Sequence, residues 1–383
     1  MESPVYDATV LGGGIIGRSI ALKLIKAKPE FKVLLIDQFS MSESQGSSKG
    51  RSKGIQKTHW VKETDTMRQM RIDSLQEWES LQMTVCPKTI MRKHEALFVG
   101  PADCPFMMYT LDSLQKYPGF DGMGYMSNAS LREQYPNIHF SDDCVGLLDA
   151  SELCLAADTI LEHILEEFEN LGGTTKKGQV TEITPGDTIN ISTKEKVYQT
   201  KKIVIATGPW SGPMMQEYGI DISLKRKHAM EMYWKLKKPY IPCPSLFEYK
   251  NKSMVWTNYT TEHGPCLKIG FPGEIITHED LHDVNKLHDK KMVIAMTKYI
   301  EDTFGEMVST IKPTQIENCV YTFTKDGKFI LGRHPEKNNI FFAVGMSGRG
   351  FGYSPAISNI VCDLVLDRQP KYDISEFDVA RFK

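Results

Sequence analysis

Three glycines near the start of the chain have the spacing of a nucleotide-binding turn. Gly12, Gly14 and Gly17 form the pattern G-x-G-x-x-G, and Asp37 lies about twenty residues further on. In such a turn the first glycine allows a tight bend, the second lets the backbone approach a pyrophosphate, and the third lets a helix pack closely on a strand. The helix N-terminus binds the phosphates and the acid binds ribose hydroxyls. The pattern predicts a dinucleotide site; the alternative is a glycine turn without ligand, followed by an ordinary acid at a strand end.

The segments around these glycines have the composition of the elements that such a turn needs. Residues 7–10 are a short β-type run, residues 18–26 have helix composition, and residues 32–36 are a second apolar run that ends at Asp37. Residues 40–57 are rich in Ser, Gly and Lys and predict a long loop at the carboxyl end of the second strand, where ligands commonly bind. The order of strand, turn, helix and strand predicts a Rossmann βαβ unit.

FAD and NAD share this fingerprint, so the choice between them depends on the rest of the chain. The triplet Ala206-Thr207-Gly208 directly follows a β-type run at residues 202–205. Flavoproteins of the two-dinucleotide-domain type return to the cofactor at such a strand end. The triplet therefore favours FAD.

The middle of the chain differs in character from its two ends. Strands spaced like those of an antiparallel sheet are expected at residues 229–235, 245–249, 254–258 and 265–271. Helices are expected at residues 65–81, 157–171, 284–307 and 355–367, and a further strand at residues 340–344. We predict an α/β fold in which a Rossmann-type FAD-binding domain is interleaved with an antiparallel-sheet, α+β substrate domain. The FAD-binding domain would comprise residues 1–85, 145–220 and 315–383, and the substrate domain residues 86–144 and 221–314.

Two motifs near the C-terminus carry a resemblance to a known family. Residues 319–335 read C-V-Y-T-F-T-K-D-G-K-F-I-L-G-R-H-P, and residues 345–351 read G-M-S-G-R-G-F. Together with the N-terminal turn, they closely resemble the monomeric sarcosine oxidase family, which includes N-methyltryptophan, pipecolate and fructosyl amine oxidases. The resemblance extends in order over nearly the whole chain. It implies a two-domain architecture like that of glycine oxidase and D-amino acid oxidase.

The resemblance gives two single residues a specific role. By itself Cys319 would be a buried small hydrophobic residue; in the family the matching cysteine is joined through its sulfur to the 8α-methyl group of the flavin. By itself Lys268 would be a solvated strand residue. In the family the lysine of the motif L-K-x-G, here residues 267–270, holds a water against flavin N5 and promotes the reaction with oxygen. A positive charge there would stabilise the anion formed when oxygen takes an electron.

The loop at residues 46–56 resembles the family pattern G-S-x-H-G-x-T-R-x-x-R and departs from it at Lys49, Lys53 and Gln56, among other positions. Lys49 stands where a histidine is common, and Lys53 stands where an arginine lies over the flavin. Lys53 keeps the charge without the fork of an arginine. Gln56 stands where a second arginine grips the substrate carboxylate, so that charge is lost.

The substrate side departs from the pattern as well. Gly352 replaces a lysine that also meets the substrate carboxylate, and Arg349 replaces a histidine. Trp256 falls near an active-site tyrosine of the family, and Pro272 replaces the histidine of sarcosine oxidase. A carboxylate without its paired cations loses charge-assisted hydrogen bonds. We therefore expect an unusual substrate, with Gln56, Trp256, Lys268 and Arg349 on the substrate side and Lys268, Lys53 and Arg349 as candidate catalytic residues.

The predicted cofactor site combines the turn, the loop, the middle triplet and the C-terminal glycine-rich segment. Its residues are Gly12, Gly14, Ile15, Ile16, Gly17, Asp37, Gln38, Ser47, Lys49, Ser52, Lys53, Val180, Ala206, Thr207, Gly208, Trp210, Cys319, Met346, Gly348, Arg349, Gly350, Phe351 and Gly352. In the C-terminal segment, backbone amides before a helix could stabilise the anion of a reduced flavin. A helix-start turn without ligand is the alternative.

The reaction that the resemblance implies is oxidation of the C–N bond of a secondary amine or of an N-substituted or cyclic amino acid. The imine would be hydrolysed, and oxygen would be reduced to hydrogen peroxide. The alternatives are a flavin dehydrogenase that passes electrons to another acceptor and a non-catalytic FAD-binding protein. Lys268 and Cys319 favour the oxidase.

Composition limits the partners and the compartment. The net charge of −2 gives no excess for binding nucleic acid, and no run of about 18 apolar residues could span a membrane. The eight cysteines form neither a C-x-x-C pair nor a His/Cys cluster at zinc spacing, so no metal is expected and a reducing compartment fits. The N-terminus lacks the features of a secretory signal and the last residues are not S-K-L. We expect an intracellular monomer, cytoplasmic or peroxisomal, whose partners are a small amine and oxygen.

Overall fold

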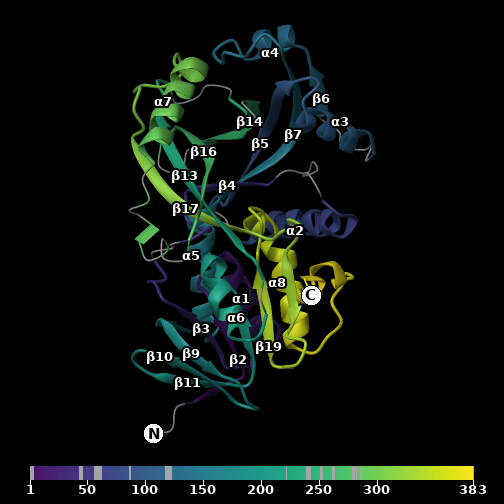
Figure 1. The fold of residues 1–383 in the computed structure, drawn as a ribbon, viewed down its shortest axis with the longest axis vertical. Helices are drawn as coiled ribbons and strands as arrows, with labels where there is room; N and C mark the ends of the chain where they lie inside the picture. The colour runs from purple at the N-terminus through teal and green to yellow at the C-terminus, as the bar shows by residue number, and fades with distance from the viewer. Residues whose placement is uncertain are drawn as a thin grey trace.

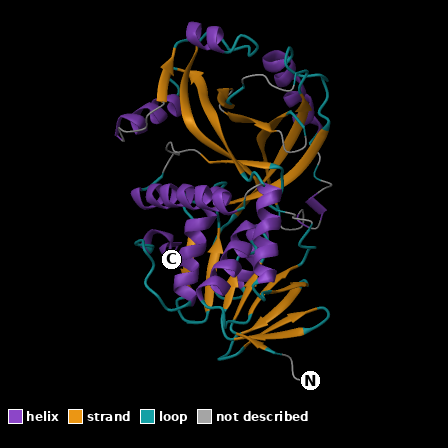
Figure 2. Ribbon diagram, turned by 180° about the vertical axis from the view of Figure 1, so that it is seen from behind, coloured by secondary structure: helices purple, strands orange, loops and turns teal. Residues whose placement is uncertain are grey.

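Three sheets and the helices around them make up the structure, a computed structural model (Figure 1, Figure 2). It describes residues 4–42, 46–55, 63–85, 88–116, 123–220, 222–238, 243–250, 253–260, 264–277, 281, 283–284, 287 and 289–382. In this part of the chain no helix has the length and apolar character to cross a lipid bilayer.

A six-stranded sheet carries the glycine turn. Its strands lie in the order β18-β19-β12-β2-β3-β8, and they are parallel except for the pair β18 and β19. Their bounds are β2 Ala8–Leu11, β3 Val33–Asp37, β8 Thr174–Lys177, β12 Ile203–Ile205, β18 Ile330–Arg333 and β19 Ile340–Val344. All residues of β2, β12 and β19 are buried. Continuous apolar runs of this kind are expected where a parallel sheet is covered on both faces.

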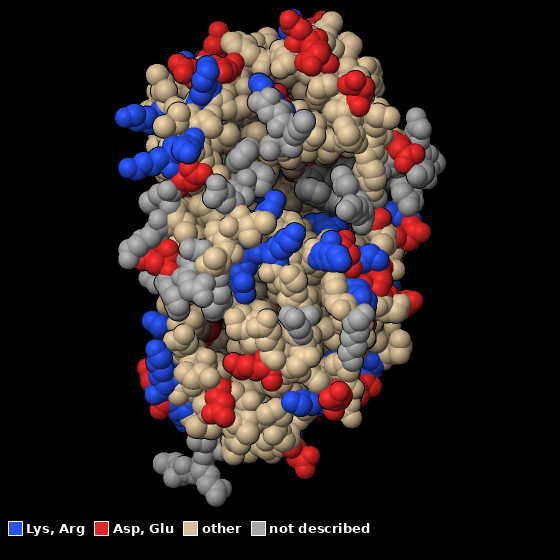
Figure 3. Space-filling view, in the orientation of Figure 1, with Lys and Arg blue, Asp and Glu red and all other residues tan. Residues whose placement is uncertain are grey.

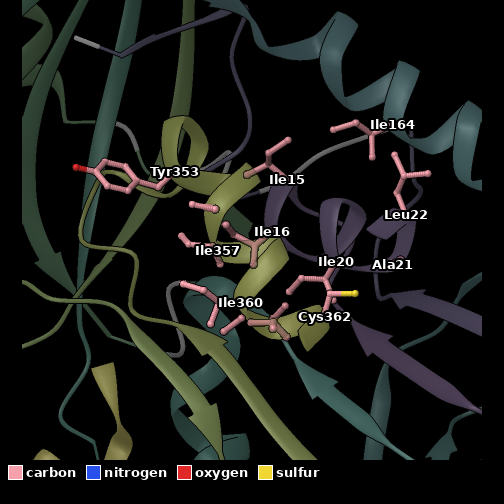
Figure 4. Close-up of a cluster of buried hydrophobic side chains, with 14 of the residues drawn as sticks. Ile15, Ile16, Ile20, Ala21, Leu22, Ile164, Tyr353, Ile357, Ile360 and Cys362 are labelled. Atoms are coloured by element: carbon pink, nitrogen blue, oxygen red, sulfur yellow. The ribbon is translucent and has the colours of Figure 1, made fainter. Parts of the chain in front are cut away.

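Helices cover one of these faces and a smaller sheet covers the other. On the first face α1 (Ile15–Ala27) packs against α5 (Ala157–Asn170) and α8 (Gly350–Val365), and α2 (Asp65–Thr84) packs on α8. Figure 4 shows side chains of α1 and α8, among them Ile16, Ile20, Ile357 and Ile360, meeting in this core. The other face carries a four-stranded sheet in the order β1-β11-β10-β9 and the short α6 (Ser211–Gln216). The bounds of that sheet are β1 Val5–Tyr6, β9 Val180–Thr184, β10 Ile189–Thr193 and β11 Val197–Thr200.

A nine-stranded sheet forms the opposite part of the molecule. It follows the order β17-β13-β16-β15-β14-β5-β7-β4, with β6 paired to β7, and only β14 and β5 are parallel. Its bounds are β4 Ser52–Ile55, β5 Met91–Pro101, β6 Met123–Met126, β7 Cys144–Ala156, β13 Lys225–Lys235, β14 Ser245–Lys250, β15 Ser253–Thr260, β16 Cys266–Ile276 and β17 Gln315–Phe323. One face packs on α7 (Lys290–Phe304), where Met232 and Trp234 meet Ile300 and Phe304. Helices α3 (Pro105–Lys116) and α4 (Asn128–Gln134) lie near β5 to β7 (Figure 1).

The described elements confirm the predicted α/β class, with three differences in detail. Residues 52–55, expected in a loop, form β4 because they pair with β7. The helix expected at residues 284–307 is shorter, because the Asp289 side chain accepts hydrogen bonds from the first N–H groups of α7 and fixes its start. The last long helix begins at Gly350, with Pro355 inside it. Tertiary packing of α8 on α1 outweighs the low helix propensity of its first residues.

The proposed division into two interleaved domains stays a prediction. Strands β4, β7 and β17 come from segments assigned to the FAD-binding domain, yet they pair within the nine-stranded sheet. The two proposed domains therefore share strands as well as connections.

A buried arginine ties the glycine turn to its surroundings. Arg18, in the first turn of α1, donates from Nε to the carbonyl of Gly13 at 2.6 Å. It also donates from its two terminal nitrogens to the carbonyls of Leu161 at 2.7 Å and Met41 at 2.5 Å. One side chain thus joins the turn, helix α5 and the loop after β3.

Replacing Arg18 with methionine should destabilise the protein, because three backbone carbonyl groups, two of them in fully buried contacts, lose a donor. A buried polar group without a partner costs about 1–3 kcal/mol, so we expect the free energy of unfolding in urea to fall by at least about 2 kcal/mol. Lys23→Met is a matched control, since it removes the half-exposed pair with Glu77 and such pairs contribute about 0–1 kcal/mol. An equal decrease in the free energy of unfolding in the two variants would contradict the role given to Arg18.

Candidate active site

A cavity of about 720 Å³ reaches from the glycine turn to the nine-stranded sheet. Residues of β3, α1 and α8 line it on one side, and residues of β4, β13, β15, β16 and β17 line it on the other. In Figure 3 the surface is hollowed near the middle of the molecule, and Lys and Arg side chains gather beside the hollow. The cavity therefore joins the predicted cofactor side to the predicted substrate side.

Most of the predicted site residues line this cavity. They are Gly12, Gly14, Ile15, Ile16, Asp37, Gln38, Ser47, Ser52, Lys53, Val180, Ala206, Thr207, Gly208, Trp210, Trp256, Lys268, Met346, Gly348, Arg349, Gly350, Phe351 and Gly352. Gly17, Lys49 and Cys319 are not among the lining residues, and Gln56 lies outside the described residues. The structure thus brings together segments that are far apart in the sequence, while the role of each residue stays a prediction.

The turn has the close backbone contacts that only glycine allows. Gly12 has φ +110°, and a Cβ atom there would lie 2.3 Å from the carbonyl oxygen of Ala206. A Cβ atom on Gly17 would lie 1.8 Å from the carbonyl oxygen of Gly12. Gly17 therefore acts through packing of α1 on β2, which explains its absence from the cavity wall.

Asp37 holds the turn from the side. Its Oδ2 accepts a hydrogen bond from the backbone of Gly13 at 2.5 Å, and its Oδ1 accepts one from the backbone of Phe39 at 2.7 Å. Burial raises the pKa of this carboxyl, and the two backbone hydrogen bonds and Arg18 offset only part of that effect. Because Asp37 lines the cavity at the end of β3, its position also suits a ribose.

Two helix N-termini face the cavity. The backbone N–H of Ile15 at the start of α1 donates to Ser48 Oγ at 2.9 Å. At the start of α8, Gly345, Ser347 and Gly348 have positive φ and turn the chain before Gly350. A glycine cradle, an acid at the strand end and two helix N-termini fit the anionic and ribose groups of FAD.

A buried cluster of three charged side chains lies on the other side of the cavity. Glu231 on β13 accepts from Lys53 Nζ at 3.0 Å through Oε1 and pairs with Lys268 Nζ at 2.8 Å through Oε2. Lys268 Nζ also donates to the carbonyl of Ser52 at 2.7 Å. An ammonium group has three N–H donors. With these two partners among the described residues, Lys268 has a third donor for a ligand in the cavity that it lines.

The charges in this cluster stabilise one another. Burial raises the pKa of the Glu231 carboxyl, but Lys268 and Lys53 outweigh that effect and hold it below its ordinary value. Burial opposes the charge of Lys53, yet Glu231 holds the pKa of this ammonium above its ordinary value. Gly50 lies against the cluster, because a Cβ atom there would be 2.4 Å from Glu231 Oε2.

Cys319 on β17 lies beside this cluster and is fully buried. Its Sγ is 3.7 Å from the carbonyl oxygen of Lys49, and its strand neighbour on the same face, Tyr321, lines the cavity. Burial and Glu231 raise the pKa of the thiol to about 12, and Lys53 and Lys268 act in the opposite direction. The predicted flavin-linking sulfur is thus close to the cluster but covered from the cavity.

The substrate side has aromatic and apolar walls. Trp256 lies over Gly270, where a Cβ atom would be 2.0 Å from the indole nitrogen. Phe247 and Met254 line the same part of the cavity, and Phe247 stacks on Phe98 with ring centroids 5.2 Å apart. Arg349 donates to the carbonyl of Gly327, and its guanidinium lies 5.5 Å from the centre of the Phe329 ring.

Sequence reasoning missed several of these residues. Glu231 could have been suspected, because it is a lone acid between Met230 and Met232 in an apolar strand. Arg18 and Ser48 gave no such signal, because their partners are backbone groups. In the sequence, Phe247 and Met254 resemble ordinary core residues; only the structure shows that they line the cavity.

Comparison with known proteins places the chain in a family. The family model described as DAO, FAD dependent oxidoreductase, matches residues 7–364. Peroxisomal sarcosine oxidase of Mus musculus is 30% identical over 390 residues, covering 100% of this chain and 97% of that protein. Monomeric sarcosine oxidase of Bacillus sp. (strain B-0618) is 23% identical, covering 98% of this chain and 96% of that protein.

Solved structures show the same fold. NikD, described as an unusual amino acid oxidase, has a TM-score of 0.85 at 16% identity and covers 98% of both chains. Glycine oxidase from Geobacillus kaustophilus has a TM-score of 0.79 at 17% identity, again with 98% of both chains covered. These findings confirm the predicted family and the choice of FAD over NAD: the chain belongs to the DAO family of FAD-dependent oxidoreductases.

Proposed function

We propose that this protein is an FAD-dependent oxidase that acts on the C–N bond of a secondary amine or of an N-substituted or cyclic amino acid. The products are an imine, which water hydrolyses, and hydrogen peroxide. The observation that carries the proposal is the position of Lys268, whose ammonium lines the same cavity as the glycine turn. Relatives named sarcosine oxidase and N-methyl-L-tryptophan oxidase support an amine as the substrate.

Each side of the cavity has its own task in this proposal. When bound, FAD supplies the electron acceptor for oxidation of the amine. The turn, Asp37 and the N-terminus of α1 hold the adenosine and phosphate groups, and the N-terminus of α8 supplies amides for negative charge. Trp256, Phe247 and Met254 hold apolar parts of the substrate and exclude water. The remaining N–H donor of Lys268 holds the water or oxygen species near the reacting atoms.

We further propose that FAD is attached covalently through Cys319. The C-terminal motif that begins at Cys319 supports this proposal, as does the position of the thiol beside Lys53 and Lys268; burial and Glu231 raise the pKa of the thiol to about 12, while the two lysine charges lower it. The proposed location is cytoplasmic or peroxisomal, and the name of the Mus musculus relative supports the peroxisome. The proposed oligomeric state is a monomer.

Denaturing mass spectrometry of the purified protein tests the covalent bond. We expect the intact mass to exceed that of the polypeptide by the mass of FAD, and we expect Cys319→Ala to abolish the increase because the attaching sulfur is gone. Cys362→Ala, which removes a buried thiol on α8, is the matched control and should keep the increase. Flavin that is released freely from the wild-type protein by acid would refute covalent attachment.

Stopped-flow reoxidation tests the role of Lys268 in the reaction with oxygen. Loss of one preorganised charge or donor commonly costs about 100-fold or more in rate, so Lys268→Met should slow reoxidation of the reduced protein on the order of 100-fold. The rate at which an amine reduces the flavin without oxygen should change much less. Lys227→Met is the control, since Lys227 also lines the cavity but lies over the Phe323 ring.

The same experiment separates the oxidase from its alternatives. Equal reoxidation rates in Lys268→Met and the wild type would remove Lys268 from the oxygen reaction. A wild-type flavin that is reduced by amines but does not react with oxygen would indicate a dehydrogenase.

A further inference from the structure

The carboxylate of Glu231 lies between two lysines, Lys53 and Lys268, in the cavity wall. Its two oxygens contact different lysines, Lys53 at 3.0 Å and Lys268 at 2.8 Å. Only 1% of the Glu231 side chain is exposed, against 11% for Lys53 and 3% for Lys268. The carboxylate is therefore held in the wall of the cavity, where an anionic ligand would otherwise meet both lysines.

The other described cations of the cavity wall are also engaged. Arg18 donates to three backbone carbonyls beside the glycine turn. Arg349 donates to the carbonyl of Gly327 and lies against the Phe329 ring, while its Nη1 has no hydrogen-bond partner among the described residues. Lys227 lies over the Phe323 ring, with its Nζ 5.8 Å from the ring centre. Within the described part of the cavity, Lys53 and Lys268 are the cations that share a wall with Trp256, and one acid already pairs with both.

The fixed carboxylate of Glu231 disfavours a second carboxylate in contact with the same two lysines. Two lysines and one glutamate leave one net positive charge in the cluster, and Lys268 keeps a single N–H donor for a ligand. An incoming carboxylate would lie close to the Glu231 carboxylate in a buried site, where repulsion between like charges is strong. The neighbouring walls of Phe247, Met254 and Trp256 suit an apolar group instead.

We propose that Glu231 is a specificity-determining residue that selects secondary amines with an apolar substituent and without a carboxylate next to the reacting nitrogen. The inference rests on the proposed amine oxidase function and narrows its substrate class. The family carboxylate anchors are lost at Gln56 and Gly352. Glu231 keeps Lys53 and Lys268 from replacing them because it already pairs with both lysines.

A matched pair of substrates tests this selection. N-methyl-2-phenylethylamine and N-methylphenylalanine differ only by the carboxylate. The wild type should have at least a tenfold higher kcat/KM for the amine. In Glu231→Gln the ratio of kcat/KM for the amine to kcat/KM for the amino acid should fall at least tenfold, because two lysines lose their acidic partner. Glu231→Asp keeps the carboxylate and should keep the preference of the wild type.

Ligand binding tests the same inference without turnover. Titrations followed by the flavin absorbance spectrum should give a weaker affinity for benzoate than for neutral benzamide in the wild type. Glu231→Gln should bind benzoate at least tenfold more tightly and benzamide unchanged. If Glu231→Gln does not fold, Glu231→Met replaces it in the same two titrations: tighter binding of benzoate with unchanged binding of benzamide supports the role of Glu231, and unchanged binding of both overturns it.

The outcomes distinguish the inference from the proposed function. A wild-type preference for N-methylphenylalanine and for benzoate would overturn the role of Glu231 even if oxidation is observed. If neither amine is oxidised, the proposed function fails, while the benzoate and benzamide titrations still support or overturn the exclusion of carboxylates.

Discussion

The ion cluster of Lys53, Glu231 and Lys268 is the interaction on which one wall of the cavity depends. It joins β4, β13 and β16, and the loop before β4 closes on it through Gly50. Buried ion pairs contribute little net stability, because removing charges from water is costly. A cluster that remains buried in spite of this cost suggests a functional reason. Here it fixes one cavity wall opposite the glycine turn, and it sets both the charge of that wall and the surroundings of the Lys268 ammonium.

The parts of the fold that the sequence predicted well depend on short-range patterns. The turn from Gly12 to Gly17 needs glycine because carbonyl groups lie where Cβ atoms would be. The strands of the six-stranded sheet are apolar throughout because both faces are buried. Such requirements are local, and a single sequence shows them. The family motifs predicted FAD as the cofactor and the family of the chain, and the comparisons with known proteins confirm both predictions.

The parts that the sequence did not predict depend on contacts between distant segments. Lys53 and Glu231 are separated by 178 positions, so no spacing pattern relates them. Residues 52–55 have a loop-like composition and become a strand only because β7 lies beside them. Cys319 was expected in the cofactor site, and the structure places it next to the cluster but behind the cavity wall. Lys268 could be found from its motif, but its acidic partner could not.

The most direct measurement of the central claim is the stoichiometry of the reaction. Purified protein would be given a limiting amount of a secondary amine, and the oxygen consumed and the hydrogen peroxide formed would be measured together. We expect equal amounts of oxygen consumed, peroxide formed and amine oxidised. Oxidation of the amine without oxygen consumption, or with transfer of electrons only to an added dye, would contradict it.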